Sequence, residues 1–136
     1  MTQMTREQVA EYRRLLAKDQ AVKRFQALGR LPKDKMNGTE KAYSMRLEAM
    51  RQRGEILGWL FHPLRVRLAD STFYEVDFLV LQADMRMAIH EVKGGHTTDK
   101  GQIKIKLCAE VLPWFVFYKA TKQPERRGGG WVLEEY

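Results

Sequence analysis

Apolar and polar residues alternate along this chain with two different periods, and the change of period divides it into helices and strands. Apolar residues three or four positions apart predict amphipathic helices, whereas alternation or a short apolar run predicts a strand. The helical period predicts helices over residues 5–17, 20–28, 39–54 and from 97 or 98 to 113. The strand pattern predicts strands over residues 57–68, 72–81, 86–93, 114–119 and 131–133.

The first 38 residues contain predicted helices and no predicted strand, and they end in residues 31–38, which are rich in turn-forming types. We therefore expect an N-terminal helical arm over residues 1–38 and a core over residues 39–136. Both belong to a single compact domain, because 136 residues can fill one hydrophobic core but not two. Three roles stay open for the arm: packing on the core, dimerisation, or gripping a nucleic-acid backbone.

Two of the predicted strands carry acidic residues inside apolar runs. Burying a carboxylate among apolar neighbours is unfavourable unless a partner compensates its charge. The period of two directs Glu91 and Lys93 to one face of their strand, and Asp77 to one face of the preceding strand. If the two strands are adjacent, the three side chains meet. A divalent cation would then compensate the clustered negative charge, beside a lysine able to face a phosphate or a water molecule.

An aspartate on one strand followed by Glu-x-Lys on the next resembles the PD-(D/E)XK nuclease superfamily. The matching residues are Val76-Asp77 and Glu91-Val92-Lys93, with Val76 at the position where the family's motif has proline. The predicted order from residue 39, which is helix, three strands as a meander, helix and strand, equals the core order of that family. The resemblance implies an α/β protein with a restriction-endonuclease-like αβββαβ core and a mixed central sheet. Small phage-type endonucleases and junction resolvases are the most similar members.

The resemblance also implies a site for metal-assisted hydrolysis of phosphodiester bonds. Asp77, Glu91 and the backbone carbonyl of Val92 would hold Mg²⁺, for which Mn²⁺ would substitute. Lys93 would position or help deprotonate the attacking water and stabilise the charge of the transition state. Glu40, on the helix before the strands, would bind the metal through a water molecule. A simpler explanation of Glu40 is that an acidic residue is favourable at a helix N-terminus.

The formal net charge of +7 favours an anionic partner, because lysines and arginines bind phosphates and release counterions. We expect DNA as this partner, bound by basic residues of the arm and of the helix that follows the Glu91 strand. The candidates are Arg13, Arg14, Lys23, Arg24, Lys100 and Lys104. A chain this short has no room for a separate domain that reads base sequence, so selection of a branch, flap or nick is favoured. Basic residues of this kind also occur as ordinary solvated surface.

The function expected from the sequence is therefore that of a Mg²⁺-dependent deoxyribonuclease. The alternatives are a catalytically inactive nucleic-acid-binding module of the same fold and a structural or assembly protein whose charged strand residues form ion pairs. A homodimer is compatible with each. No apolar run approaches the roughly eighteen residues of a membrane helix, and the single cysteine, Cys108, fits a reducing compartment. We expect a cytoplasmic protein without membrane contact, in the host cytoplasm if the chain is phage-encoded.

Three further expectations concern individual segments. Thr39 is expected to cap the helix that contains Glu40. Ile103, Leu107 and Val111 give the helix before Pro113 an apolar side. His90 should point away from its neighbour Glu91, and residues 128–130, three glycines, are expected to form a flexible turn.

Overall fold

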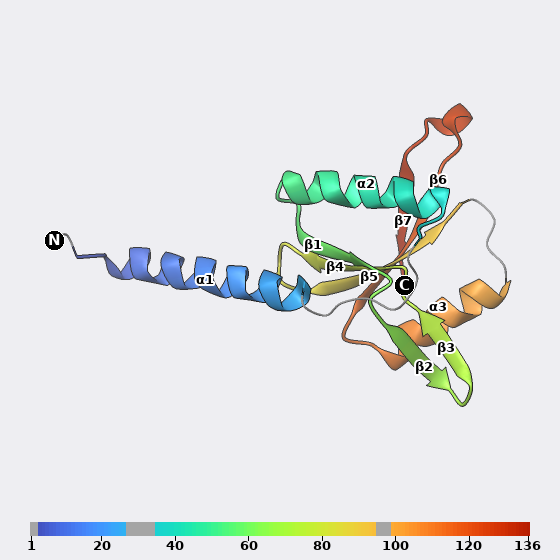
Figure 1. Cartoon of the computed structure of the whole chain (residues 1–136), viewed down its shortest axis with the longest axis horizontal. Helices are drawn as coiled ribbons and strands as arrows, with labels where there is room; N and C mark the ends of the chain where they lie inside the picture. Colours follow the sequence, from blue (N-terminus) through green and yellow to red (C-terminus); the bar gives the residue numbers. More distant parts are fainter. Residues whose placement is uncertain (1–2, 27–34, 95–98) are drawn as a thin grey trace.

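The computed structural model describes residues 3–26, 35–94 and 99–136, except for the side chains of residues 99–101. This part of the chain contains both helices and strands, as expected for an α/β protein (Figure 1). The helices are α1 (Arg6–Gln26), α2 (Gly38–Gln52), α3 (Asp99–Val111) and the short 3₁₀ helix η1 (Glu125–Arg127). The strands are β1 (Ile56–Phe61), β2 (Arg65–Ala69), β3 (Thr72–Glu75), β4 (Phe78–Gln82), β5 (Met87–Lys93), β6 (Val116–Lys122) and β7 (Trp131–Glu135).

A five-stranded sheet in the order β1-β4-β5-β6-β7 forms the centre of the molecule, and β2 and β3 form a separate two-stranded hairpin. The β5–β6 pair is parallel and the other pairs of the large sheet are antiparallel, so the sheet is mixed as predicted. The parallel pair is connected through α3, which is the crossover that two parallel neighbours require. The α/β class and the mixed sheet are thus confirmed.

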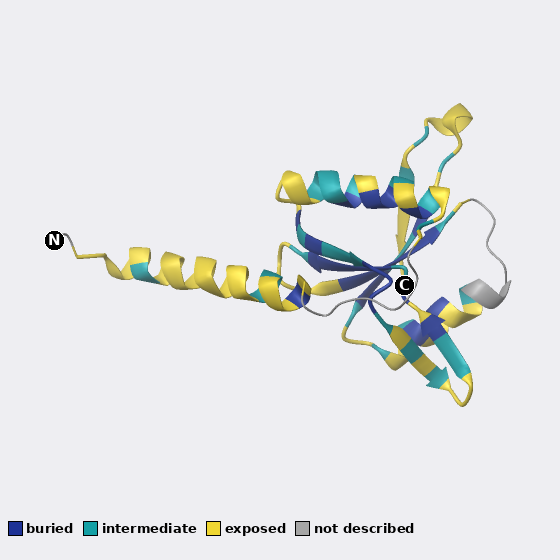
Figure 2. Ribbon diagram, viewed as in Figure 1, coloured by how far each residue is buried: buried dark blue, intermediate teal, exposed yellow. Residues whose placement is uncertain are grey.

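Both faces of the sheet are covered, which explains the nearly continuous apolar sequence of β4 and β5. On one face, Tyr43 and Leu47 of α2 pack against Phe78 and Val80 of β4. On the other face, the buried residues come from α1, α3, the β2–β3 hairpin and the central strands. They are Phe25, Tyr74, Val76, Leu79, Leu81, Ile89, Ile105, Cys108 and Phe117. Figure 2 shows the buried positions concentrated in the sheet and on the sides of the helices that face it.

Two of the predicted strands are each divided by the fold. The segment expected over 57–68 breaks at His62 and Pro63 into β1 and β2, which belong to different sheets. His62 has a φ of 52°, a left-handed conformation that ends β1. The segment expected over 72–81 breaks at Val76 and Asp77 into β3 and β4. The pairings of the predicted three-strand meander are confirmed, because β1 pairs with β4, β2 with β3 and β4 with β5, all antiparallel; what differs is that the first two segments are each divided between two sheets.

The N-terminal arm is one helix of 21 residues, where two shorter helices were predicted. Only its last turns contact the core: Phe25 is buried and lies against Gly58 of β1, where an added Cβ would come within 3.3 Å of the Phe25 ring. The rest of α1 projects away from the sheet (Figure 1). Its apolar side chains, including Tyr12, Leu15 and Leu16, are exposed.

The ends and faces of α2 and α3 differ from the predictions in two details. The N-cap of α2 is Asn37 and not Thr39, because the Asn37 side chain accepts the backbone N–H of Glu40. In α3 the residues that pack inward are Ile105 and Cys108, whereas the expected apolar side at Ile103, Leu107 and Val111 is exposed. Among the described residues, no helix has the length and hydropathy required to cross a bilayer.

Candidate metal-binding and catalytic site

Asp77 lies at the break between β3 and β4 and is tied to the neighbouring strand β5. Its Oδ2 accepts the backbone N–H of Val92 at 2.9 Å. The strand register supports the same neighbourhood, because Phe78, the residue after Asp77, is opposite His90, the residue before Glu91. The structure therefore brings together the two segments that carry the Asp and Glu-x-Lys pattern. Asp77 itself lies in a bend and not within a strand.

Glu91 occupies the last part of β5 and is only 6% exposed. Its Oε1 lies 3.0 Å from the Lys93 ammonium, and its Oε2 accepts a hydrogen bond from the hydroxyl of Tyr74 in β3. Both oxygens of this buried carboxylate therefore have partners, as the cost of burying a charge requires. Lys93 and Glu91 project to the same side of β5, as the alternation predicted.

Tyr74 is the site residue that sequence reasoning did not identify. It is 5% exposed and belongs to the apolar cluster beneath the hairpin, yet its hydroxyl reaches Glu91. The signal was present in principle, because a buried tyrosine hydroxyl requires a hydrogen-bond partner. The partner could not be named from the sequence, since it lies on a different sheet.

The electrostatic environment of Asp77 is unusual for a carboxyl group. Burial and then the negative charge of Glu91 raise the pKa of Asp77 to about 8, against a lowering by the Val92 N–H. A hydrogen bond with Glu91 and the charge of Glu40 raise it further. The pKa of Tyr74 also lies well above its usual range, because burial and the Glu91 charge disfavour the phenolate. The site thus opposes a second negative charge and would be stabilised by a proton or a cation.

Glu40 stands at the first turn of α2 and is 4% exposed. Its Oε1 accepts the backbone N–H of Asn37 at 3.0 Å, while its own N–H donates to Asn37 Oδ1 at 2.8 Å. This reciprocal pair is a capping box, so the helix-terminus explanation of Glu40 is confirmed. Its charge also contributes to the raised pKa of Asp77, which places it within electrostatic reach of the site. The metal role of Glu40 stays a prediction.

The donor set fits a hard cation better than a transition metal. Asp77, Glu91 and a backbone carbonyl offer oxygen ligands only, as Mg²⁺ prefers. Within residues 3–26, 35–94 and 99–136, no group of three histidine, cysteine, aspartate or glutamate residues is arranged to hold a metal ion. A metal here would therefore have two carboxylate ligands and complete its shell with carbonyl, water or phosphate oxygens. The raised pKa of Asp77 is consistent with this chemistry, because a divalent cation relieves the repulsion that raises it.

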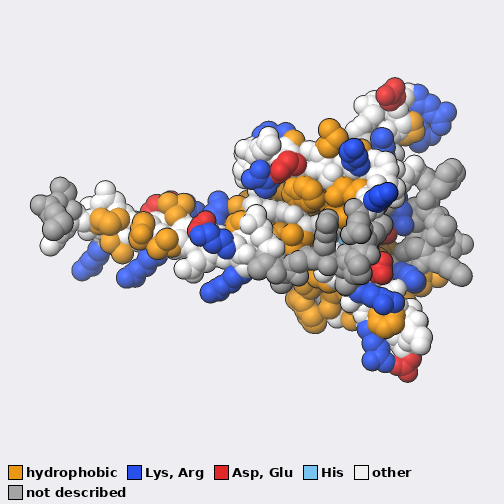
Figure 3. Space-filling model, viewed as in Figure 1, with side chains coloured by type: hydrophobic (Ala, Val, Ile, Leu, Met, Phe, Trp, Pro, Cys, Tyr) orange, Lys and Arg blue, Asp and Glu red, His pale blue; other side chains and the backbone are white. Residues whose placement is uncertain are grey.

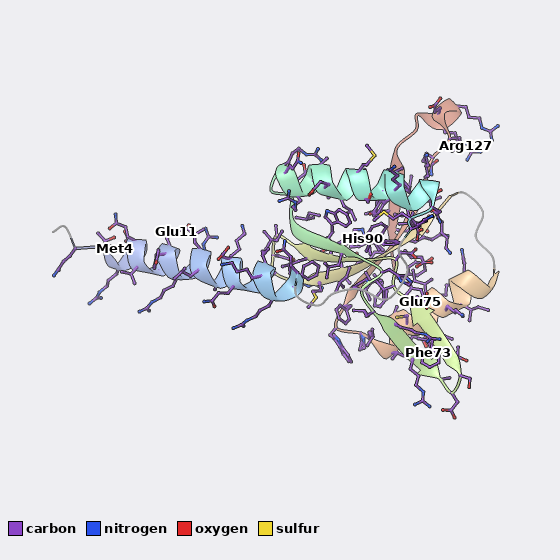
Figure 4. All side chains as sticks on the ribbon, in the orientation of Figure 1. Met4, Glu11, Phe73, Glu75, His90 and Arg127 are labelled. Carbon is purple, nitrogen blue, oxygen red and sulfur yellow. The ribbon has the colours of Figure 1, made fainter. Side chains whose placement is uncertain are left out.

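The predicted DNA-binding cations are distributed over different parts of the molecule. Arg13, Arg14, Lys23 and Arg24 are exposed on α1, where Arg14 pairs with Glu11 at 2.7 Å and Lys23 with Asp19 at 3.2 Å. Much of the arm is distant from the carboxylates, as the separation of Glu11 from His90 and Glu75 shows in Figure 4. On α3, Lys104 is exposed and lines a cavity of about 280 Å³ together with Tyr74 and Arg65. The side chain of Lys100 lies outside the described part of the chain.

His90 projects from β5 to the opposite face, as predicted. It is 5% exposed, and its Nδ1 lies 2.5 Å from the Tyr43 hydroxyl. Its ring also contacts Tyr118 at a centroid distance of 5.3 Å. Burial, assisted by the nearby charge of Arg46, lowers the pKa of His90 to about 4, so the imidazole is neutral near pH 7. This histidine is a packed polar residue of the core.

The chain matches no protein-family model, and neither a curated protein nor a solved structure shows significant similarity to it. Its function must therefore be inferred from its own residues. The group that combines burial, clustered charge and a basic neighbour is Asp77, Glu91 and Lys93, with Tyr74 and Glu40 beside it. Such a cluster of ionisable groups with a strongly shifted pKa is typical of a functional site.

Proposed function

We propose that this protein is a Mg²⁺-dependent endonuclease that hydrolyses phosphodiester bonds of DNA. The observation that carries the proposal lies where β4 begins and β5 ends: Asp77 accepts the Val92 N–H at 2.9 Å, and Lys93 lies 3.0 Å from Glu91. This is the residue set of the Asp and Glu-x-Lys pattern, held together at the ends of two interior strands of a mixed sheet. The restriction-endonuclease-like core is part of the same proposal.

The order of elements supports that core. From α2 onward, the strands of the large sheet follow as β1, β4 and β5, then α3, then β6. This is the αβββαβ order, with the β2–β3 hairpin inserted between the first and second strands of the large sheet. β7 adds an edge strand antiparallel to β6.

Asp77, Glu91 and the Val92 carbonyl would hold the metal ion. Bound there, Mg²⁺ supplies charge stabilisation to the phosphate and acidifies a coordinated water. Lys93 would orient the attacking water and stabilise the negative charge that develops on the phosphoryl oxygens. Glu40 would accept a hydrogen bond from a water molecule of this site. Tyr74 would fix the orientation of the Glu91 carboxylate through its hydroxyl hydrogen bond.

The proposed substrate is selected by DNA structure and not by base sequence. The proposed contacts are cations that bind the phosphate backbone, which would position a branch, flap or nick without reading bases. Arg13, Arg14, Lys23 and Arg24 of the arm and Lys100 and Lys104 of α3 are the proposed backbone contacts. Cations at such positions would add affinity without reading bases.

A second candidate is a catalytically inactive DNA-binding module or an assembly protein of the same fold. It is favoured by one specific observation: both oxygens of Glu91 already have protein partners in Lys93 and Tyr74. A charge satisfied in this way is compatible with a purely structural role. Under this alternative, the protein would bind DNA in a salt-sensitive manner without cutting it, or would bind it weakly.

A homodimer stays a prediction, and α1 offers the surface that supports it. The exposed apolar residues Tyr12, Leu15 and Leu16 lie on the part of α1 that precedes Phe25 and projects away from the core. Sedimentation equilibrium of the parent and of a Leu15→Glu, Leu16→Glu variant would test it. Dissociation of the variant into monomers would support the dimer, and a monomeric parent would contradict it.

Cleavage of linear, flapped and four-way DNA in Mg²⁺, in Mn²⁺ and in EDTA tests the main proposal. Asp77→Asn should abolish cleavage, because it removes a proposed metal ligand. Asp70→Asn is the control: it is the same substitution on the exposed β2–β3 turn and should leave cleavage unchanged. The proposal predicts cleavage in Mg²⁺ and Mn²⁺ that EDTA removes. Binding without cleavage under every condition would favour the inactive module instead.

A further inference from the structure

A groove of about 620 Å³ lies beside the end of β5 and is lined by Gly94 and residues 121–127. Gly94 follows Lys93 directly, and Lys93 is opposite Thr121 in the parallel register of β5 and β6. The groove therefore begins one residue from the proposed catalytic lysine and continues along the connection from β6 to β7. The sequence indicated nothing about this connection beyond the expected turn at its three glycines.

The start of the groove is also close to Glu40. A Cβ placed on Gly94 would lie 3.3 Å from Thr39 Oγ1, so the end of β5 passes tightly against the first turn of α2. A larger side chain at Gly94 would press against that turn. The first turn of α2 and the β6–β7 connection therefore both approach the chain at Gly94, directly after Lys93.

The charge of the groove is strongly one-sided. Its wall contains three cations, Lys122, Arg126 and Arg127, and one carboxylate, Glu125. All three cations are exposed, and none forms an ion pair with a carboxylate in the described part of the chain. Four other arginines, at 14, 51, 53 and 67, each have a carboxylate partner within 4 Å. Figure 3 shows basic side chains gathered at the tip of the β6–β7 connection, which projects at the upper right of the view.

The backbone of the tip has a defined hydrogen-bonded shape. The N–H groups of Arg127 and Gly129 donate to Pro124 O at 2.9 and 3.1 Å, and Gln123 N–H donates to Gly130 O at 2.9 Å. The three glycines have φ values of 93°, 64° and 74°, which side chains with a Cβ rarely adopt. This glycine run, which was expected to be a flexible turn, begins with Gly128, the C-cap of η1, directly after the two arginines (Arg127 is labelled in Figure 4).

We infer that this groove binds the phosphate backbone of DNA adjoining the scissile phosphate, with Lys122, Arg126 and Arg127 as the contacting cations. The inference rests on the proposed nuclease function. It adds the surface along which the bound DNA strand would continue beyond the scissile phosphate. The ligand class follows from the chemistry of the wall: uncompensated guanidinium and ammonium groups bind phosphate oxygens, and their exposed positions suit a polyanion. An acidic peptide could bind these cations anywhere on the surface. A DNA strand cut beside Lys93 must continue across a neighbouring surface, and the groove begins at the next residue, Gly94.

The test measures DNA affinity in the Asp77→Asn background, so that cleavage does not consume the probe. Three substitutions, Lys122→Gln, Arg126→Gln and Arg127→Gln, are combined in one variant. The matched control combines Arg51→Gln, Arg53→Gln and Arg86→Gln, which remove the same charge at the end of α2 and before β5, the opposite end of the sheet. A third variant, Lys122→Arg, Arg126→Lys and Arg127→Lys, keeps the charge. Fluorescence anisotropy with labelled four-way and linear DNA is recorded at several salt concentrations.

The groove variant should lose roughly 10- to 100-fold in affinity near 0.1 M salt, and its log–log salt slope should fall by about 2 to 3, close to one per lost phosphate contact. The control should change affinity by less than about 3-fold, since scattered charge acts only at long range. The charge-keeping variant should bind as the parent does. Thermal unfolding of all three verifies that they are folded.

Two negative outcomes have different meanings. If the parent cleaves DNA in Mg²⁺ but the groove variant and the control bind equally well, the inference is wrong and the proposed function stands. If the parent neither binds nor cleaves DNA, the proposed function fails and the groove has no DNA to bind.

Discussion

His90 and Glu91 are neighbours in β5, and they bury polar groups on opposite faces of one sheet in two different ways. On the α2 face, neutral His90 has a neutral partner, the Tyr43 hydroxyl, and aromatic neighbours. On the other face, Glu91 meets a lysine, a tyrosine hydroxyl and a second carboxyl group, Asp77. The first group is stable without charge. The second requires a positive partner.

The pKa values of His90 and Asp77 are both shifted, and both shifts favour the neutral form of the side chain. Burial lowers the pKa of His90 to about 4 and keeps the ring neutral at pH 7. Burial and the Glu91 charge raise the pKa of Asp77 to about 8, so its carboxylate form is disfavoured near neutrality. A sequence selected only for stability would remove such repulsion. Ionisable groups with strongly shifted pKa values are more frequent at functional sites than elsewhere, and the proposed site is such a group.

The largest expected effect is on DNA cleavage, which should depend on the Glu91 face of β5 and not on the His90 face. Glu91→Gln should abolish cleavage, because it removes an anionic metal ligand while keeping the shape of the side chain. His90→Phe, on the opposite face, should retain cleavage at temperatures where the variant is folded. Single-turnover rates at saturating Mg²⁺ measure both. Equal loss in the two variants would show that the faces are not functionally distinct.

A second prediction concerns Lys93. Lys93→Ala should lower the single-turnover rate by ~10² to 10⁴, because it removes a group that acts on the water and the transition state. Affinity for DNA at fixed salt should fall only slightly, since other cations share the phosphate contacts. Lys41→Ala, an exposed lysine of α2, is the control. If rate and affinity fall in parallel for Lys93→Ala, the lysine is only a phosphate anchor.

The His90 face makes a prediction about acid stability. The folded-state pKa of about 4 lies below the usual value of 6.5, so the unfolded chain binds the proton first. The contribution of neutral His90 is complete above about pH 6.5 and is lost as the pH falls toward 4, amounting to about 2 to 4 kcal/mol. Urea unfolding from pH 7 to 4 should show a smaller loss of stability for His90→Phe than for the parent. Parallel curves would contradict the assignment.

The Asp77 face predicts the opposite pH dependence, with a smaller expected effect. Because the folded pKa is raised, the metal-free protein should lose stability as the pH rises from about 4 toward 8. Asp77→Asn should remove this loss and gain on the order of 1 to 2 kcal/mol at pH 8, since the amide oxygen can still accept the Val92 N–H.

Urea unfolding in EDTA and in Mg²⁺ checks this prediction for Asp77. The advantage of Asp77→Asn should appear in EDTA and vanish when Mg²⁺ stabilises the parent. An equal advantage in both solutions would mean that no metal binds at this aspartate. Asp70→Asn, on the exposed turn, should show no such dependence.

The sequence predicted the features that depend on local periodicity. The helical spacing located α2 and α3, and the apolar runs located β5, β6 and β7, because apolar residues recur with the period of the element that carries them. The same alternation correctly directed Glu91 and Lys93 to one side of β5 and His90 to the other. It also singled out Asp77 and Glu91, since a carboxylate in an apolar strand requires a partner whatever the fold.

Tertiary structure alone decided which elements meet. The sequence did not divide β1 from β2 or β3 from β4, because the division follows from the pairing partners: β1 pairs with β4 in the large sheet, and β2 pairs with β3 in the hairpin. In α3, two sides are apolar, and the sheet covers the one with Ile105 and Cys108. Tyr74 became part of the site because a second sheet brought its hydroxyl to Glu91. Such choices depend on contacts between residues distant in sequence, whose total burial no local pattern contains.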